Sequence, residues 1–559
     1  MESLLRGDKS SSIPSLAGKI NLIYIDPPFF TGSDFSVKTT IGNKEVEKEP
    51  SIIEQRAYID TWSQGIASYL KYMYERLVLM RELLADNGSI YVHLDERLGH
   101  YIKIILDEIF GYDNFRNEIV WRYKSGGSSE KGHYSRKHDV IFFYTKSDKY
   151  TFRTLKEKSY SREFKPYHFE GVQEFTDEIG SYTVVNMKDV WNIDMVGRTS
   201  KERLDYATQK PEQLLKRIIV NSSNEGDLIA DFFCGSGTTA AVAEKLGRRW
   251  IMCDLGKFAI HTTRKRLMNI HKSKLLKDNL NEIYEEMPEI KEEFIEYGNP
   301  SRPFEILNIG NYSIGDWQEK EEGFVKFILQ LYQTKPLTGF NYIHGEKEKR
   351  AVHVGSLSAP VTIDEIKTVV EECNNNNFKS LDVLGLEWGY GVNELAKALA
   401  QKSKVDLRLI QIPSYNELSA ALVGLDLNLF KIPDEIVEEK ISENIKFLEL
   451  SYLELETKIK GKNVELEIAD FQLPPTPELA EIADKIKDPI DLIDYWAVDW
   501  DYQGDTFHNQ WQSYRTKKEP KVDKKATYTY EKAGKYQIMV KVIDVFGGDV
   551  SKIINVKIK

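Results

Sequence analysis

The pattern of hydrophobic and polar positions predicts two buried strands far apart in the chain. Residues 22–25 form a short apolar run without polar alternation, and Pro27 and Pro28 end it, which is typical of a buried parallel strand. Residues 228–232 show the same pattern, and a glycine-containing turn follows them. Because ligands bind at the carboxyl ends of parallel strands, we expect the residues after both runs to form a site.

The second run begins a strand–turn–helix–strand pattern. It comprises a strand at residues 228–232, a tight turn at Gly235, Ser236 and Gly237, a helix at 238–246 and a strand at 250–253. Asp254 ends the pattern, and an acid about 20 residues after such a turn can accept hydrogen bonds from ribose hydroxyls. Thr238 stands near the place of a third glycine, so the pattern favours a nucleoside without a pyrophosphate.

Asp26, Pro27, Pro28 and Phe29 form the motif DPPF, and residues 233–237 form FCGSG far downstream. This order of motifs resembles the β-class DNA amino-methyltransferases, which methylate an exocyclic amine of a base with S-adenosyl-L-methionine. The stretches 87–96, 117–123 and 208–218 agree, and the resemblance covers residues 15–270. Residues 352–362 and 380–413 also look like parts of type III modification subunits.

The resemblance implies a role for each residue of DPPF. Asp26 and the carbonyl of Pro27 would accept the N–H groups of the target amine, whose lone pair is otherwise delocalised into the ring. Pro28 would stiffen the loop, and Phe29 would stack on the base, which is worth about 1–3 kcal/mol and helps to offset base flipping. Asp at the first position favours adenine N6, with cytosine N4 as the alternative.

The resemblance also implies a cofactor site and no metal. The cofactor-binding residues expected from the matching motifs are Lys210, Asp231, Phe233, Gly235, Ser236, Gly237, Thr238 and Asp254. Cys234, Cys253 and Cys373 lack CxxC spacing, so neither a zinc site nor a disulfide framework is indicated. This cysteine usage and the absence of a long apolar run predict a soluble protein of a reducing cytoplasm, without a membrane partner.

Net charge alone argues against a nucleic-acid-binding protein, because the chain carries −11. Residues 115–165, however, contain 13 Lys plus Arg against 6 Asp plus Glu, and phosphate contact requires such a local excess. The predicted DNA contacts are Lys124, Lys131, Arg136 and Lys137. The alternative is a solvated basic loop.

With 559 residues the chain is too long for one core, and we expect an α/β protein of several parts. Residues 1–122 and 206–272 are the catalytic and cofactor-binding halves of a Rossmann-like methyltransferase sheet, and 123–205 are a target-recognition insert. The remaining parts are an acidic linker at 273–300, an accessory α/β region at 301–475 and a β-rich domain at 476–559. The alternation after Tyr528 and the turn at Gly547 and Gly548 predict a hairpin in a small β-sandwich of immunoglobulin-like or PKD type.

Two classes of function remain open from the sequence. The first is a site-specific DNA adenine methyltransferase, solitary or in a restriction–modification system with a separate restriction subunit or as a homodimer. The second is a DNA-recognition subunit with an inactive catalytic domain. Only 25 residues precede Asp26, whereas relatives carry a further strand there, so we expect a chain that begins inside the domain and binds the cofactor weakly.

Overall fold

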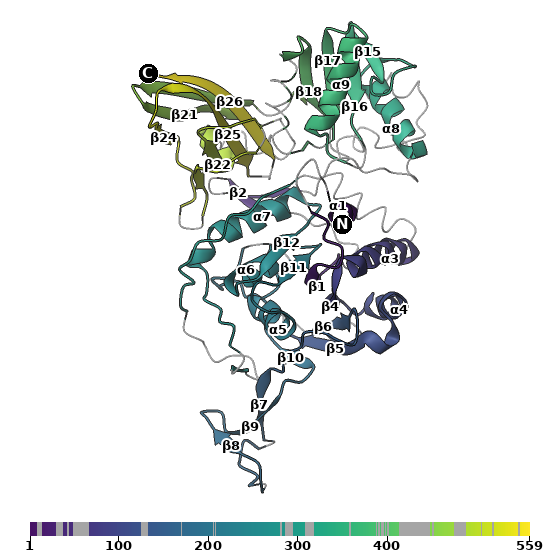
Figure 1. The fold of residues 1–559 in the computed structure, drawn as a ribbon, viewed down its shortest axis with the longest axis vertical. Coiled ribbons are helices and arrows are strands. Elements are labelled where there is room, and N and C mark those ends of the chain that lie inside the picture. The colour runs from purple at the N-terminus through teal and green to yellow at the C-terminus, as the bar shows by residue number, and fades with distance from the viewer. Residues whose placement is uncertain are drawn as a thin grey trace. The chain divides into compact units, whose positions relative to one another are not determined.

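The fold is described here from a computed structural model of the whole chain (Figure 1). The described residues are 1–7, 14–28, 37–41, 44–48, 66–124, 132, 134–161, 163–168, 170–204, 206, 208–279, 282–284, 294–307, 318–356, 359–386, 388–389, 392, 396, 399, 402–412, 448–449, 452–473, 488–504, 506–516, 519–545 and 548–559. They fall into two compact units, Met1–Ser33 with Ala57–Phe304 and Asp34–Arg56 with Glu305–Lys559. Every helix in these ranges is too short or too polar to cross a membrane.

The first unit is built on a seven-stranded sheet in the order β10-β5-β6-β4-β1-β11-β12 (Figure 1). Its strands are β1 (Ile20–Ile25), β4 (Leu84–Leu94), β5 (Phe115–Arg122), β6 (His138–Thr145), β10 (Val190–Asn192), β11 (Leu228–Asp231) and β12 (Arg249–Met252). The neighbours β4, β1, β11 and β12 run parallel, and β6 is antiparallel to β4 and β5. The three strands predicted from apolar runs are confirmed as β1, β11 and β12, with ends that differ by one or two residues.

Helices cover both faces of this sheet. Helices α3 (Ile66–Leu83) and α4 (Gly99–Phe110) share a core with Ile23 and Ile25 of β1. Helices α5 (Glu212–Ser222) and α6 (Thr238–Lys245) share a second core with Leu22 of β1, and α7 (Lys257–Met268) packs on α6. The chain leaves β1 toward β4 but leaves β11 toward β12, so the strand order reverses between β1 and β11. Ligand-binding crevices form at such a reversal, outside the carboxyl ends of the strands.

A second sheet of the first unit has the order β13-β7-β9-β8 and extends away from the seven-stranded sheet (Figure 1). It comprises β7 (Lys156–Tyr160), β8 (Glu174–Thr176), β9 (Ser181–Asn186) and β13 (Ile283–Tyr284). The predicted insert boundaries, 123–205, are wrong, because β6 and β10 inside that range belong to the main sheet. The pairing of β6 with β4 and β5 is long-range, and local composition does not reveal it.

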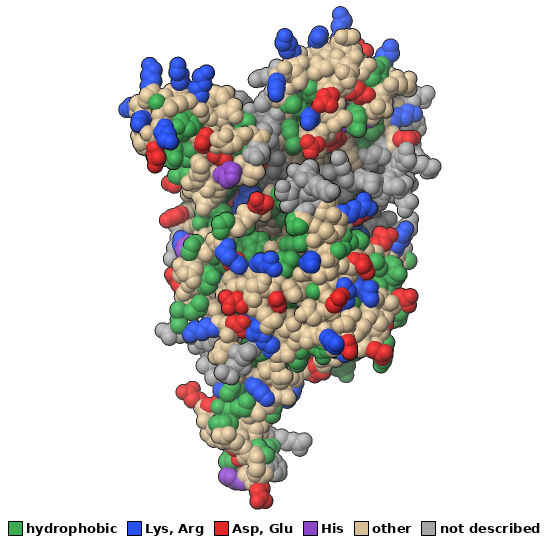
Figure 2. Space-filling model, viewed as in Figure 1, with side chains coloured by type: hydrophobic (Ala, Val, Ile, Leu, Met, Phe, Trp, Pro, Cys, Tyr) green, Lys and Arg blue, Asp and Glu red, His purple; other side chains and the backbone are tan. Residues whose placement is uncertain are grey.

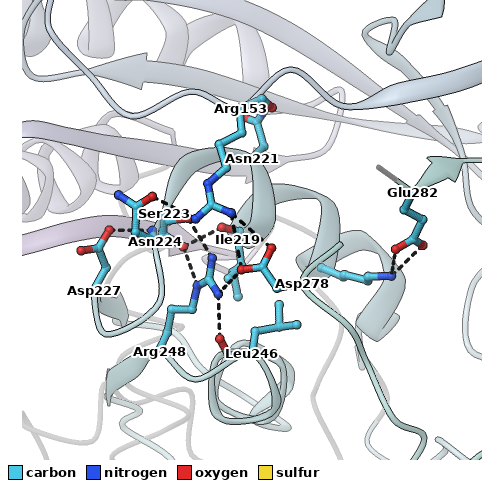
Figure 3. Close-up of polar contacts among 11 residues, drawn as sticks. Arg153, Ile219, Asn221, Ser223, Asn224, Asp227, Leu246, Arg248, Asp278 and Glu282 are labelled. Atoms are coloured by element: carbon cyan, nitrogen blue, oxygen red, sulfur yellow. Dashed lines mark hydrogen bonds and ion pairs between the residues drawn. The ribbon is translucent and has the colours of Figure 1, made fainter. Parts of the chain in front are cut away.

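The prediction of an acidic linker at residues 273–300 is wrong for the described part of that range. Asp278 accepts hydrogen bonds from Arg153 at 3.2 Å and from the fully buried Arg248 at 2.5 Å, and Figure 3 shows both guanidinium groups directed at this carboxylate. Glu282 pairs with Lys216 at 2.6 Å, and β13 then joins the second sheet beside β7. Asp278 and Glu282 are neutralised by cations from distant segments, which a local charge count cannot show.

The second unit contains an α/β region. Its sheet has the order β14-β15-β16-β17-β18-β19, in which β16, β17 and β18 run parallel. The strands are β14 (Lys335–Pro336), β15 (Gly345–Lys347), β16 (Arg350–Val354), β17 (Ser380–Gly385), β18 (Asp406–Gln411) and β19 (Leu448–Glu449), and the helices are α8 (Gln318–Leu331) and α9 (Ile363–Asn375). Elsewhere the described chain forms the helix α1 (Glu2–Arg6) and the hairpin of β2 (Val37–Ile41) and β3 (Lys44–Lys48).

The C-terminal part has two antiparallel sheets that share one hydrophobic core. One sheet contains β20 (Tyr452–Lys460), β21 (Asn463–Gln472) and β24 (Lys525–Thr529), and the other contains β22 (Ile493–Asp499), β23 (Trp511–Tyr514), β25 (Gly534–Asp544) and β26 (Asp549–Ile558). The predicted hairpin is confirmed as β25 and β26; Gly547 of its turn lies outside the described residues. The predicted boundary at 476 is wrong, because β20 and β21 already contribute Leu453 and Phe471 to this core.

Asp278→Ala should destabilise the first unit, because it leaves the buried Arg248 without its carboxylate. Arg248 retains bonds to Ser223 and to the carbonyl of Leu246, so we expect a loss of about 2–4 kcal/mol in the free energy of unfolding. Asp86→Ala is the matched control, since the Asp86 side chain is 96% exposed beside Lys146. Urea unfolding measures both variants, and equal losses would contradict a role for the Asp278 pairs.

Candidate active site

Asp26 follows β1 directly and lies at the strand-order reversal. One of its carboxylate oxygens, Oδ2, accepts a hydrogen bond from Nζ of Lys210, which precedes α5. The other oxygen, Oδ1, is buried and has no hydrogen-bond partner among the described residues. A buried acceptor without a partner is costly, so Oδ1 is suited to accept a donor from a ligand.

The glycine loop after β11 lies beside Asp26 because β1 and β11 are paired neighbours. Asp254 accepts the backbone N–H of Gly235 at 2.8 Å and that of Gly256 at 2.9 Å, so its carboxylate anchors the loop. Gly237 has φ of +70°, and a Cβ there would lie 2.6 Å from Oγ1 of Thr263. The chain therefore needs glycine at Gly237, both for the backbone conformation and for the close approach of α7.

Asp231 ends β11 and supports the same loop from within. Its Oδ1 accepts the N–H of Phe233 at 3.0 Å and its Oδ2 accepts the hydroxyl of Thr239 at 2.6 Å. Burial raises the pKa of Asp231 to about 7, and the nearby carboxylates Asp26 and Asp254 act in the same direction. Both oxygens are thus occupied by the protein itself, and Asp231 acts on the loop conformation.

A buried ion cluster that sequence reasoning missed holds Ser236 and Thr238. Arg266 of α7 donates to Oγ1 of Thr238 at 2.8 Å and to the carbonyl of Ser236 at 3.3 Å. Arg266 and Lys245 both pair with Glu212, at 3.0 and 2.6 Å. Burial would raise the pKa of Glu212, but the two cations outweigh it and lower the pKa. Oγ1 of Thr238 also donates to the carbonyl of Lys210, which joins the loop to the Asp26 partner.

A series of hydrogen-bonded polar side chains connects β1 with neighbouring strands of the sheet. The hydroxyl of Tyr24 bonds to Nδ1 of His93 at 2.8 Å, Nε2 of His93 lies 3.2 Å from Asp139, and Tyr123 donates to Asp139 at 3.1 Å. Burial acts to raise the pKa of Asp139, but the hydrogen bonds from His93 and Tyr123 and the charge of Lys210 give a net decrease. The sequence signal for this series is the presence of Tyr24 and His93 among the apolar residues of β1 and β4.

The predicted DNA contacts are only partly described. Lys124 and Arg136 are exposed, and Lys137 is half-buried. Arg136 is not free, since its Nε pairs with Glu96 at 2.8 Å. Phe29 of the catalytic motif and Lys131 lie outside the described residues.

The fold is an α/β domain in which the carboxylate of Asp26 lies beside the glycine loop that follows β11. The family model described as DNA methylase matches residues 20–265. Type II methyltransferase M.HpaI of Haemophilus parainfluenzae is 32% identical over 249 residues, which cover 44% of this chain and 68% of that protein. The chain belongs to this DNA methylase family, and the resemblance to DNA amino-methyltransferases is confirmed.

Two further relatives cover the same part of the chain. Type II methyltransferase M.EcaI of Enterobacter cloacae is 33% identical over 307 residues, 44% of this chain and 64% of that protein. The chain thus spans somewhat less than two thirds of this relative. DNA adenine methyltransferase YhdJ of Escherichia coli (strain K12) is 26% identical over 281 residues, 48% of this chain and 82% of that protein. The likeness to type III subunits stays a prediction.

The pKa of Asp231 makes stability depend on pH. A carboxyl whose pKa is higher in the folded state stabilises the fold fully below its unfolded value, and this contribution is lost as pH rises through about 7. Between about pH 5 and about pH 8 we expect the free energy of unfolding to fall by about 2–3 kcal/mol relative to Asp231→Asn, which cannot ionise. Hydrogen exchange of the β11 amides measures this difference.

Asp148→Asn, at an exposed carboxylate, is the control for this comparison. The control should follow the pH dependence of the parent protein. A stability difference between parent and Asp231→Asn that is constant over this pH range would contradict the titration of a buried Asp231.

Proposed function

We propose that this chain transfers a methyl group from S-adenosyl-L-methionine to the N6 amine of adenine in duplex DNA. The observation that carries the proposal is the position of Asp26, with one buried unbonded oxygen, beside the glycine loop of β11. The family and the name of the relative YhdJ, an adenine methyltransferase, support adenine as the target base.

The residues at the crevice fit S-adenosyl-L-methionine. The cofactor carries a positively charged sulfonium, and Asp26, Asp231 and Asp254 make this edge of the sheet rich in carboxyl groups. Gly235 has φ of +48° and no side chain between the loop backbone and the crevice, which suits close approach of a nucleoside. The bound cofactor would supply an electrophilic methyl group, and Gly235, Asp254 and Lys210 would hold it at the loop.

Within this proposal Asp26 acts on the amine. Oδ1 accepts one amine N–H and holds the proton that nitrogen releases, while Lys210 fixes Oδ2 and so orients the carboxylate. The carbonyl of Pro27 is the proposed second acceptor, and Pro28 restricts the loop. Phe29 is proposed to stack on the flipped base.

The proposed DNA contacts flank this site in sequence. Lys124, Lys131, Arg136 and Lys137 would contact phosphates, and the second sheet of the first unit would read the target sequence. To contact a phosphate, Arg136 would have to leave its ion pair with Glu96. The names of M.EcaI and M.HpaI support a place in a restriction–modification system, with a separate restriction subunit or a second copy of this chain as partner.

The direct test is expression of this chain alone in cells that lack adenine methylation. Sequencing with detection of modified bases should reveal N6-methyladenine at one short motif. Methylated cytosine at such a motif would overturn the choice of base, and unmodified DNA would overturn the proposed activity.

Asp26→Ala should abolish methyl transfer, with a loss of at least about 10²–10³ in kcat, because the amine loses its acceptor. Lys210 would then lose its partner, so Asp26→Ala with Lys210→Met is the matched variant that removes both charges. We expect both variants to be inactive. By calorimetry, Asp26→Ala should bind the cofactor with little change in Kd, whereas the double variant should bind it more weakly because it also loses Lys210, a proposed cofactor contact. Near-parental methylation by either variant would contradict the assignment of Asp26.

Gly235→Val should weaken cofactor binding by at least about tenfold, because a branched residue is strained at φ of +48° and its Cβ would lie 3.3 Å from the ring of Tyr206. Gly197→Val is the control, since a Cβ at this glycine of the same unit meets open space. Calorimetry gives the Kd, and melting temperatures show whether both variants fold. Equal Kd values would place the cofactor away from this loop.

A further inference from the structure

Six lysines from three segments meet at one end of the C-terminal sandwich. This lysine end comprises Lys460, Lys462, Lys532, Lys535, Lys557 and Lys559. The register brings them together: the N–H of Tyr530 donates to the carbonyl of Lys462 at 2.9 Å, and Lys535 lies directly opposite Lys557 on β26. Figure 2 shows Lys and Arg side chains gathered where the C-terminus lies in Figure 1.

The charges of the lysine end are not neutralised by the described residues. All six side chains belong to exposed residues, and none of them forms an ion pair with a described carboxylate. Other lysines of the sandwich differ: Lys458 pairs with Glu467 at 3.4 Å, Lys521 with Asp491 at 3.0 Å and Lys525 with Glu465 at 3.1 Å. Lys458, Lys521 and Lys525 are thus ion-paired, whereas the six lysines of the lysine end are not paired with a described carboxylate.

The lysine end carries a local electrostatic cost. Like charges directly opposite each other on paired strands, as in Lys535 and Lys557, destabilise a sheet. The turn that carries Lys532 is held by the hydroxyl of Tyr536, which donates to the carbonyl of Lys532 at 3.0 Å. Nζ of Lys462 donates to the carbonyl of Glu531 at 2.7 Å, which holds this cation in place without neutralising its charge. A cation that is already ordered costs less to bring against an external polyanion.

We propose that the lysine end binds the phosphate backbone of duplex DNA without reading its sequence. The choice of DNA rests on the proposed function, and the surface adds a second contact, separate from the catalytic motifs, in a different unit of the chain. Duplex DNA carries one charge per about 1.7 Å of axis, and each lysine that neutralises a phosphate releases condensed counterions. Cognate and non-cognate DNA should therefore gain affinity equally.

The test compares two triple variants of the full chain that change the charge by the same amount. The first is Lys460→Gln with Lys535→Gln and Lys557→Gln; the control is Lys458→Gln with Lys521→Gln and Lys525→Gln. For a long duplex, the slope of log affinity against log salt should decrease in magnitude by about 2–3 in the first variant and remain parental in the control. Affinity near 0.1 M salt should fall on the order of tenfold to a hundredfold, for cognate and non-cognate DNA alike.

Activity separates this surface from the catalytic site. The first variant should keep the cofactor Kd and the kcat at saturating DNA of the parent protein. It should melt no lower than the parent, because it removes the repulsion between Lys535 and Lys557. A parental salt slope in the first variant, or an equal change in both variants, would overturn the DNA-binding surface while leaving adenine methylation intact. A reduced slope with no methylation by the parent would support the surface and overturn the proposed function.

A membrane surface is the other polyanion that this test covers. Vesicles of phosphatidylserine and phosphatidylcholine provide the probe, with co-sedimentation as the measurement. Vesicle binding that the first variant loses, together with a parental salt slope on DNA, would overturn the proposal in favour of anionic lipid.

Discussion

The parallel pairing of β1 with β11 is the constraint on which the rest of the site depends. Leu22 pairs with Ile229 and Ile23 with Ala230, so segments about 200 residues apart end at the same edge of the sheet. The strand order reverses at this pair, so Asp26 and the glycine loop meet at the position where ligands bind in open α/β sheets. Apolar burial of β1 on both faces stabilises the pairing.

Most charged groups described around this edge have partners within the protein, but Oδ1 of Asp26 does not. The carboxylates of Asp231 and Asp254 accept hydrogen bonds from backbone N–H groups of the loop, and Glu212 is neutralised by two cations. Such pairing is needed because an unpaired buried charge is far more costly than an unpaired dipole. Oδ1 of Asp26 is the buried carboxylate oxygen of this edge that stays open, and the proposed chemistry uses that oxygen.

Local charge counts along the sequence do not show which charged groups are neutralised in the fold. The acidic segment around Asp278 is structural, because Arg153 and Arg248 neutralise it from positions far away in the sequence. The sequence does not show the lysine end as one patch, because its six residues come from three separate segments. Electrostatic energy depends on distance in space and on burial, and neither quantity can be read from the order of residues.

The sequence by itself determined the buried strands, the loop and the family, because continuous apolar runs, glycine turns and the motif DPPF are local signals. It also placed Asp26 and Gly235 at one sheet edge, since parallel strands share that edge. Only the tertiary structure showed that Lys210 bonds to Asp26 and that Arg266 bonds to Thr238. It also placed β6 in the main sheet and not in the insert. These contacts join segments distant in sequence, so hydrophobic periodicity and composition carry no information about them.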